Sequence, residues 1–123
     1  MSNIGFILLY VEDVARSAAF YSRLLEQPVP ESSPNFAMLP VGPSLMLGLW
    51  RRGEVEPRPV GGPGAAEIAV ALSDDAAVEA AHENWRAQGV AIAQTPTRMD
   101  FGYTFVGLDP DGHRLRAFAP SRG

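Results

Sequence analysis

Two stretches of the chain decide the fold: Phe6-Ile-Leu-Leu-Tyr-Val-Glu-Asp-Val-Ala-Arg-Ser-Ala-Ala-Phe-Tyr21 and Glu67-Ile-Ala-Val-Ala-Leu-Ser-Asp-Asp-Ala-Ala-Val-Glu-Ala-Ala-His82. They align without a gap when the sequence is shifted by 61 residues, and the alignment continues to Val29 and Val90. Six of the 24 aligned pairs are identical. More importantly, an apolar run, an acidic turn and a helical pattern fall in the same register in both copies. The sequence therefore predicts two copies of one β-α-β unit.

The same elements can be assigned inside each copy. A β-rich apolar run (residues 4–11 and 67–72) precedes an acidic residue suited to cap a helix, namely Asp13 and the segment 73–75. Each predicted helix then presents one apolar stripe to a sheet. The stripes are Ser17, Phe20 and Leu24 in the first helix, and Val78, Ala81 and Trp85 in the second. We expect Pro28 to stop the first helix and Gly89 to follow the end of the second.

Short strands follow each helix, at residues 35–41 and 44–51 and then at 90–94, 103–108 and 113–119. The turn Asp109-Pro-Asp-Gly112 joins the last two, since Pro presets φ and Gly accepts a positive φ. The fold class predicted is α+β, with two βαβββ modules in a single domain over residues 1–123. Module one covers residues 1–51, a linker rich in Pro and Gly covers 52–64, and module two covers 65–123.

Composition excludes several classes of function. The chain has 123 residues, a net charge of −4 and no cysteine, and all ten of its basic residues are Arg. An acidic chain does not favour nucleic acid as a partner. The absence of Cys and Lys removes thiolate and Schiff-base chemistry. No apolar run is long enough to cross a membrane and no signal peptide is evident, so we expect a cytoplasmic protein with no membrane partner.

Two segments resemble a known superfamily. Val11-Glu-Asp13 leading to Ser17-Ala-Ala-Phe-Tyr21 resembles the opening of the vicinal-oxygen-chelate proteins, and residues 105–116 resemble their closing hairpin. This superfamily includes glyoxalase I, extradiol dioxygenases, fosfomycin-modifying enzymes and bleomycin-type resistance proteins. The resemblance covers nearly the whole chain. It implies that two modules pair their sheets into a half-barrel, often across a dimer interface, so we expect a homodimer.

The resemblance also assigns four metal-ligand positions. In this chain they are occupied by Phe6, by Leu47 or a residue beside it, by Glu67 and by Arg116. Divalent metals need several His or carboxylate donors, and a permanent cation at a ligand position repels them. We therefore expect no metal and no other cofactor, and we expect Glu67 and Arg116 to form a charge-assisted pair. His82 and His113 have no partner at the spacing of a catalytic triad, so no catalytic residue is predicted.

Aromatic side chains suggest a ligand site instead. Within the superfamily, the chain most resembles the phenazine-resistance type, through Leu49-Trp50, Glu67-Ile68, Glu83-Asn-Trp85, Phe101-Gly102, Thr104-Phe105 and Asp109-Pro-Asp-Gly-His113. Such proteins sequester a flat aromatic drug between stacked rings. The expected ligand-binding residues are Trp50, Phe6, Phe36, Leu47, Glu67, Phe101, Tyr103 and Arg116. Two alternatives stay open. One is a lyase- or dioxygenase-like enzyme with an atypical site, using Glu67 or Tyr103 for acid-base work or a metal bound at a site that the sequence does not reveal. The other is a binding or interaction module whose small aromatic or amphipathic ligand is not an antibiotic.

Overall fold

A computed structural model describes residues 2–121 of the chain. It divides into two compact units, Met1–Gly61 (unit one) and Gly62–Gly123 (unit two). The division lies inside the segment predicted to be a linker. A short 3₁₀ turn, η1 (Arg52–Glu54), opens that segment, and neither helix nor strand follows until Glu67.

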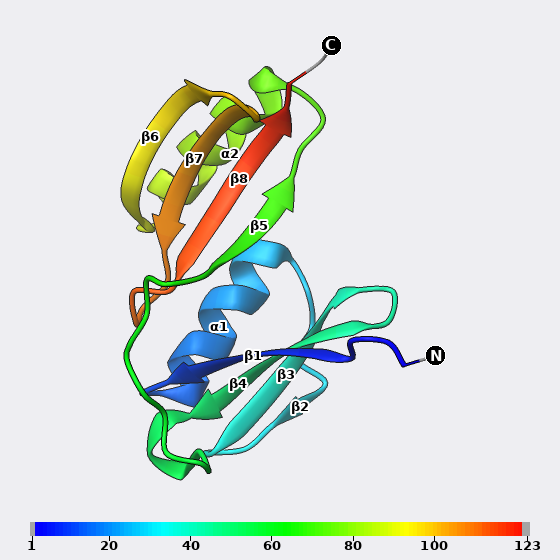
Figure 1. Ribbon diagram of the computed structural model, residues 1–123, viewed down its shortest axis with the longest axis vertical. Coiled ribbons are helices and arrows are strands. Elements are labelled where there is room, and N and C mark those ends of the chain that lie inside the picture. The colour runs from blue at the N-terminus through cyan, green and yellow to red at the C-terminus, as the bar shows by residue number, and fades with distance from the viewer. Residues whose placement is uncertain (1, 122–123) are drawn as a thin grey trace. The chain divides into compact units, whose positions relative to one another are not determined.

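Unit one has the order βαβββ, as the repeat predicted (Figure 1). Its elements are β1 (Phe6–Val11), α1 (Val14–Leu25), β2 (Glu31–Ser32), β3 (Phe36–Gly42) and β4 (Leu45–Arg51). The strands form one mixed sheet in the order β1-β4-β3-β2, in which β1 runs parallel to β4 and the other pairs are antiparallel. The two-residue strand β2 was not predicted, because no periodic pattern can be recognised in so short an element.

Helix α1 begins where the sequence predicted and ends earlier. The Asp13 carboxylate accepts a hydrogen bond from the Arg16 backbone N–H at 3.0 Å, which satisfies one free amide of the first turn. The helix stops at Leu25, because Glu26 adopts the left-handed conformation with φ of 52°. Its backbone N–H donates to the Ser22 carbonyl. The helix therefore ends three residues before Pro28, which was expected to stop it.

Unit two repeats the plan. Its elements are β5 (Glu67–Ala71), α2 (Asp75–Ala87), β6 (Ala91–Met99), β7 (Gly102–Leu108) and β8 (Arg114–Pro120). They form a mixed sheet in the order β5-β8-β7-β6, with β5 parallel to β8. Asp74 caps α2 by accepting from the Ala77 backbone N–H at 2.8 Å, and Gly89 follows the helix with φ of 85°. Both features were predicted.

Strand β6 is longer than the sequence indicated. It was predicted to end at Gln94 but continues to Met99, with breaks in its register against β7 on either side of Gln94. Bulges interrupt the alternation of apolar and polar residues by which a strand is recognised. No helix among residues 2–121 is long and apolar enough to cross a membrane.

The core of each unit lies between its helix and one face of its sheet. In unit one, Leu39, Leu47 and Leu49 are buried on the side where α1 packs against β3 and β4. In unit two, the Trp85 ring of α2 meets the Phe105 ring of β7 edge-on, at 4.9 Å between centroids. Neither sheet is covered on its other face by the helix of its own unit.

Candidate functional site

The uncovered face of the first sheet is almost entirely apolar. Residues paired across neighbouring strands point to the same side of a sheet, so the strand register defines this face. We call it the open face of unit one. It consists of Phe6, Leu8 and Tyr10 of β1, Met46, Gly48 and Trp50 of β4, and Phe36, Met38 and Pro40 of β3. The Tyr10 hydroxyl and the Trp50 indole N–H are the polar side-chain groups of this set. The Glu31 side chain of the short edge strand β2 lies on the same side, because Glu31 pairs with Met38.

Aromatic rings meet across the strands of this face. The Tyr10 and Trp50 rings lie edge-on, with centroids 6.1 Å apart and an angle of 81° between their planes. The centroids of the Phe6 and Phe36 rings are 6.5 Å apart. Gly48 lies between these pairs, and a Cβ atom there would approach Leu8 Cδ2 to 2.6 Å. Glycine therefore allows the side chains of neighbouring strands to close over β4, and it leaves a continuous aromatic and aliphatic surface.

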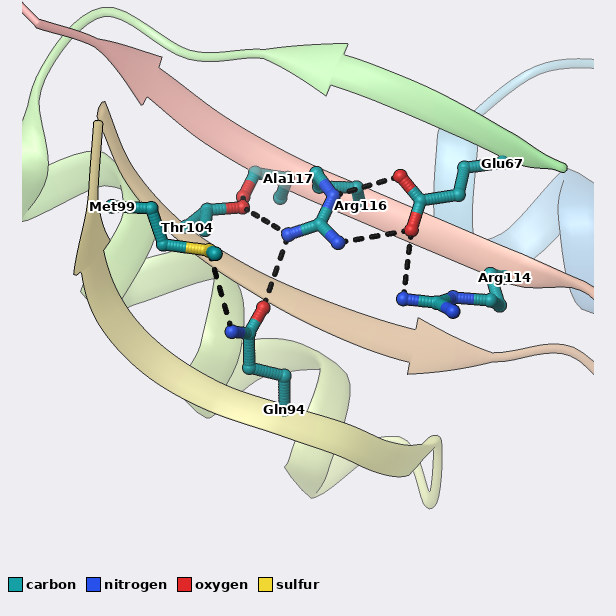
Figure 2. A network of polar contacts seen from close by, with 7 residues as sticks. All are labelled: Glu67, Gln94, Met99, Thr104, Arg114, Arg116 and Ala117. Carbon is teal, nitrogen blue, oxygen red and sulfur yellow. Dashed lines mark hydrogen bonds and ion pairs between the residues drawn. The ribbon is translucent and has the colours of Figure 1, made fainter. Parts of the chain in front are cut away.

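The open face of unit two has a different chemistry. A polar network crosses the sheet there, centred on Glu67 and Arg116 (Figure 2). Arg116 Nε donates to Glu67 Oε1 at 2.8 Å, and Arg116 Nη2 donates to Glu67 Oε2 at 2.9 Å. Arg116 Nη1 donates to Gln94 Oε1 at 3.0 Å and to Thr104 Oγ1 at 3.2 Å. Arg114 Nη2 approaches Glu67 Oε2 at 2.9 Å from the other side. The predicted pair of Glu67 and Arg116 is confirmed, in its bidentate form.

Both members of the pair are held in their charged states. The hydrogen bond from Arg116 lowers the pKa of the Glu67 carboxyl below its usual 4.5, and the positive charges of Arg116 and Arg114 add to this effect against desolvation. The same hydrogen bond raises the pKa of Arg116. At neutral pH one carboxylate therefore lies between two guanidinium groups.

An aromatic patch adjoins the network. The Phe101 and Phe118 rings meet edge-on at 6.1 Å, and the Arg116 guanidinium carbon lies 5.7 Å from the Phe101 ring centroid. Phe101, in the turn between β6 and β7, is 45% exposed. The open face of unit two thus combines a charged half and an aromatic half.

Six of the eight predicted ligand-binding residues lie on or beside these open faces. Phe6, Phe36 and Trp50 belong to unit one, and Glu67, Phe101 and Arg116 to unit two. Leu47 and Tyr103 lie on the helix side of their sheets. Leu47 is 1% exposed within the core, and its neighbours Met46 and Gly48 take the open-face positions.

Tyr103 is directed toward α2. Its hydroxyl donates to Glu79 Oε2 at 2.7 Å, and the Arg98 guanidinium lies 5.0 Å from its ring centroid. The hydrogen bond to the Glu79 carboxylate raises the pKa of Tyr103. A phenol held in this way does not share a face with Glu67, so the two groups considered for acid-base work do not form one site within unit two.

Several residues of the open faces were not in the predicted set. They are Leu8, Tyr10, Met38, Met46, Gln94, Thr104, Arg114 and Phe118. Strict alternation along Arg114-Leu-Arg116 places both guanidiniums on one face of a strand, and this signal was present in the sequence. Gln94 could not have been found in this way, because it lies at a register break.

The residues at the four positions that the superfamily uses for metal ligands do not fit a metal ion. Their single carboxylate, Glu67, is already held by two guanidiniums, and Phe6 and Leu47 have no donor atom. Among residues 2–121, no group of three or more His, Cys, Asp or Glu side chains is arranged to hold a metal.

Two βαβββ units, each with a helix on one face of a mixed four-stranded sheet, define a glyoxalase-like α+β protein. The family model described as the glyoxalase/bleomycin resistance protein/dioxygenase superfamily matches residues 3–117. The chain belongs to this superfamily, as its sequence motifs predicted.

Individual relatives agree with this assignment. The chain is 28% identical over 112 residues to the phenazine antibiotic resistance protein EhpR of Enterobacter agglomerans, covering 89% of this chain and 85% of that protein. The solution structure of protein ATC0852 from Agrobacterium tumefaciens is 41% identical, with a TM-score of 0.90 and coverage of 99% of this chain and 100% of that one. A glyoxalase/bleomycin resistance protein/dioxygenase from Nocardioides is 25% identical, with a TM-score of 0.83 and coverage of 100% and 86%.

Proposed function

We propose that this protein binds a planar aromatic compound, such as an antibiotic, reversibly and without a metal ion. The observation that carries the proposal is the open face of unit one, where Trp50, Tyr10, Phe6 and Phe36 converge on a nearly apolar surface. In this proposal the compound is sequestered and leaves the protein unchanged.

The energetics of such a surface suit binding without catalysis. Stacked or edge-on aromatic pairs contribute about 0.5–1.5 kcal/mol each beyond the burial of apolar area. Two ring contacts and the area they bury can account for a micromolar dissociation constant, about −8 kcal/mol. This affinity suffices for a protein that protects by binding a toxic compound stoichiometrically.

The choice of ligand class has a separate support. EhpR is a phenazine antibiotic resistance protein, and its match covers most of both chains. A phenazine is a flat tricyclic aromatic compound. It has the shape and polarity that the open face of unit one favours.

Phenazine itself is a suitable probe. Equilibrium dialysis against the purified protein is expected to give saturable binding of one phenazine per chain, with a dissociation constant of about 1–10 μM. Chromatography of the dialysed compound after prolonged incubation is expected to recover it unchanged. A failure to bind phenazine up to its solubility limit, or its conversion to a product, would each overturn the proposal.

A further inference from the structure

The open face of unit two carries an excess of positive charge. Glu67, Arg114 and Arg116 lie together on this face, because Glu67 pairs with Arg114 across β5 and β8 and Arg116 follows two residues later on the same side of β8. One carboxylate thus faces two guanidiniums, which leaves one positive charge unbalanced. The chain as a whole has a net charge of −4, so this local charge is not a general property of its surface.

The unbalanced charge resides on Arg114. Four polar contacts hold the Arg116 guanidinium, to Glu67, Gln94 and Thr104. Within the described part of the chain, Arg114 pairs only with Glu67, through Nη2. Its Nε is buried without a hydrogen-bond partner, so a ligand can use only the terminal nitrogens Nη1 and Nη2. The side chain of Arg114 is 39% exposed, against 15% for Arg116. Arg116 therefore organises the network, and Arg114 retains donors that a ligand can use.

The aromatic half of the face continues along the same strand. Residues 114, 116 and 118 of β8 alternate onto the open face, and the small side chains Ala69 and Ala71 lie opposite Arg116 and Phe118 on β5. The small neighbours lie on the β5 side alone, since Thr104, Val106 and Leu108 of β7 pair with Phe118, Arg116 and Arg114. Phe101 stands edge-on to Phe118. Strand geometry places the Arg114 and Phe118 backbones about 13 Å apart, a span that a fused aromatic acid can bridge between the two side chains.

We propose that the open face of unit two binds a carboxylate-bearing aromatic compound, with the carboxylate on Arg114 and the ring against Phe118 and Phe101. A guanidinium matches a carboxylate in planar geometry, and the aromatic pair disfavours a small hydrated anion. This inference goes beyond the proposed function, because it concerns residues of unit two alone and is tested without reference to Trp50.

Three probes separate the contributions of charge and ring: 2-naphthoate, its neutral analogue 2-naphthamide, and acetate. Titrations of ¹⁵N-labelled protein, followed by NMR, give each dissociation constant and its location. We expect 2-naphthoate to bind about tenfold more tightly than 2-naphthamide, as for a charge-assisted contact. The largest shifts should fall on β8 and on Phe101. Acetate should not saturate at the same concentrations.

Variants identify the residue responsible. Arg114→Gln is expected to weaken 2-naphthoate binding about tenfold and to leave 2-naphthamide binding unchanged. Glu67→Gln should strengthen 2-naphthoate binding, because it removes the competing carboxylate. Arg98→Gln is the matched control, since Arg98 pairs with Asp75 elsewhere in unit two. If Arg114→Gln fails to fold, Arg114→Lys is expected to keep a reduced preference for 2-naphthoate over 2-naphthamide, since it retains the charge without the planar fork.

Three results would overturn the inference. The first is equal affinity for 2-naphthoate and 2-naphthamide. The second is unchanged 2-naphthoate binding in Arg114→Gln, or shifts confined to β4 of unit one. The third is acetate binding as tight as that of 2-naphthoate, which would show that the face binds anions without any contribution from an aromatic ring.

Discussion

The Arg116 guanidinium forms a bidentate, side-on pair with the Glu67 carboxylate. Its Nε donates to one carboxylate oxygen at 2.8 Å and its Nη2 donates to the other at 2.9 Å. Both residues occupy positions at which metal-dependent members of the superfamily place ligands. Here these positions hold an ion pair, whose carboxylate oxygens are already engaged. This geometry leads to the first two predictions.

The purified protein is expected to contain well under one equivalent of Zn, Ni, Fe or Mn per chain. The residues at the four positions supply one carboxylate, and divalent metals require several converging donors. Elemental analysis by mass spectrometry after gentle purification measures this directly. A full equivalent of metal that mild chelation does not remove would contradict the prediction.

Glu67→Gln is expected to lower the free energy of unfolding by about 1 kcal/mol at pH 7, because it leaves two guanidiniums together without their counter-charge. Since the pKa of Glu67 is lowered in the folded state, its contribution is complete above pH 4.5 and is lost as the pH falls through the lowered value. The gap between wild type and variant should therefore narrow at pH 3. Urea denaturation at both pH values tests this.

The control for that experiment is Asp75→Asn, which breaks the exposed pair of Asp75 and Arg98. It should cost less than Glu67→Gln at pH 7, because solvent screens both of its charges. A Glu67→Gln penalty of the same size at pH 3 and pH 7 would show that the loss is not electrostatic.

His82→Phe is expected to raise the free energy of unfolding by about 1 kcal/mol. The His82 ring lies edge-on to Phe105, at 5.3 Å between centroids, and its buried Nε2 has no hydrogen-bond partner in the described part of the chain. Phenylalanine keeps the ring contact and removes the unsatisfied nitrogen. The repeat supports the change, because the equivalent position in unit one is the buried aromatic Tyr21.

Glu83→Gln serves as the matched control for His82, since the Glu83 carboxylate is 3.8 Å from His82 Nδ1. It should leave the free energy of unfolding almost unchanged. A His82→Phe variant less stable than wild type in urea would mean that the histidine nitrogen is satisfied, for instance by an ordered water.

The protein is expected to form a two-fold homodimer. Strand β1 is an edge of its sheet, and Phe6, Ile7 and Leu8 along it are exposed. Unpaired apolar edges favour association, and closed two-fold symmetry is the commonest outcome. Light scattering at tens of micromolar should give twice the chain mass of 13.2 kDa, and a particle of 13.2 kDa would count against it.

The sequence predicted the fold more completely than the site. Helix caps and apolar helix faces are local sequence features. Both occur twice in this chain, with the caps at Asp13 and Asp74, so both units could be recognised. The face on which a strand residue lies depends on register, which local sequence does not fix. For this reason Leu47, predicted with one residue of uncertainty, lies next to an open-face position, and Tyr103, predicted to bind ligand, lies on the helix side of β7.

Side-chain contacts between neighbouring strands were harder to predict from the sequence than the face on which each residue lies. The pairing of Glu67 with Arg116 was predicted because the resemblance aligned both with ligand positions. Arg114 and Gln94 are joined to them only by the topology of the folded sheet, through β5–β8 pairing and a register break in β6. Alternation along β8 places Arg114 on the same face as Arg116, but no pattern within β5 or β6 marks which residues lie opposite them.

The substitution Trp50→Ala tests whether the aromatic open face of unit one binds a planar ligand. Trp50 is partly buried on an open face, whereas Trp85 is 5% exposed and packs against Phe105. Trp85→Ala is therefore the contrasting variant. It should cost about 3–5 kcal/mol of stability through the void it leaves.

The decisive measurement is the dissociation constant of phenazine for Trp50→Ala, taken together with its melting temperature. We expect phenazine binding to weaken by about 1–3 kcal/mol, from fivefold to more than a hundredfold, with only a modest change in melting temperature. An unchanged dissociation constant, or a Trp50→Ala variant that unfolds while Trp85→Ala remains folded, would contradict it.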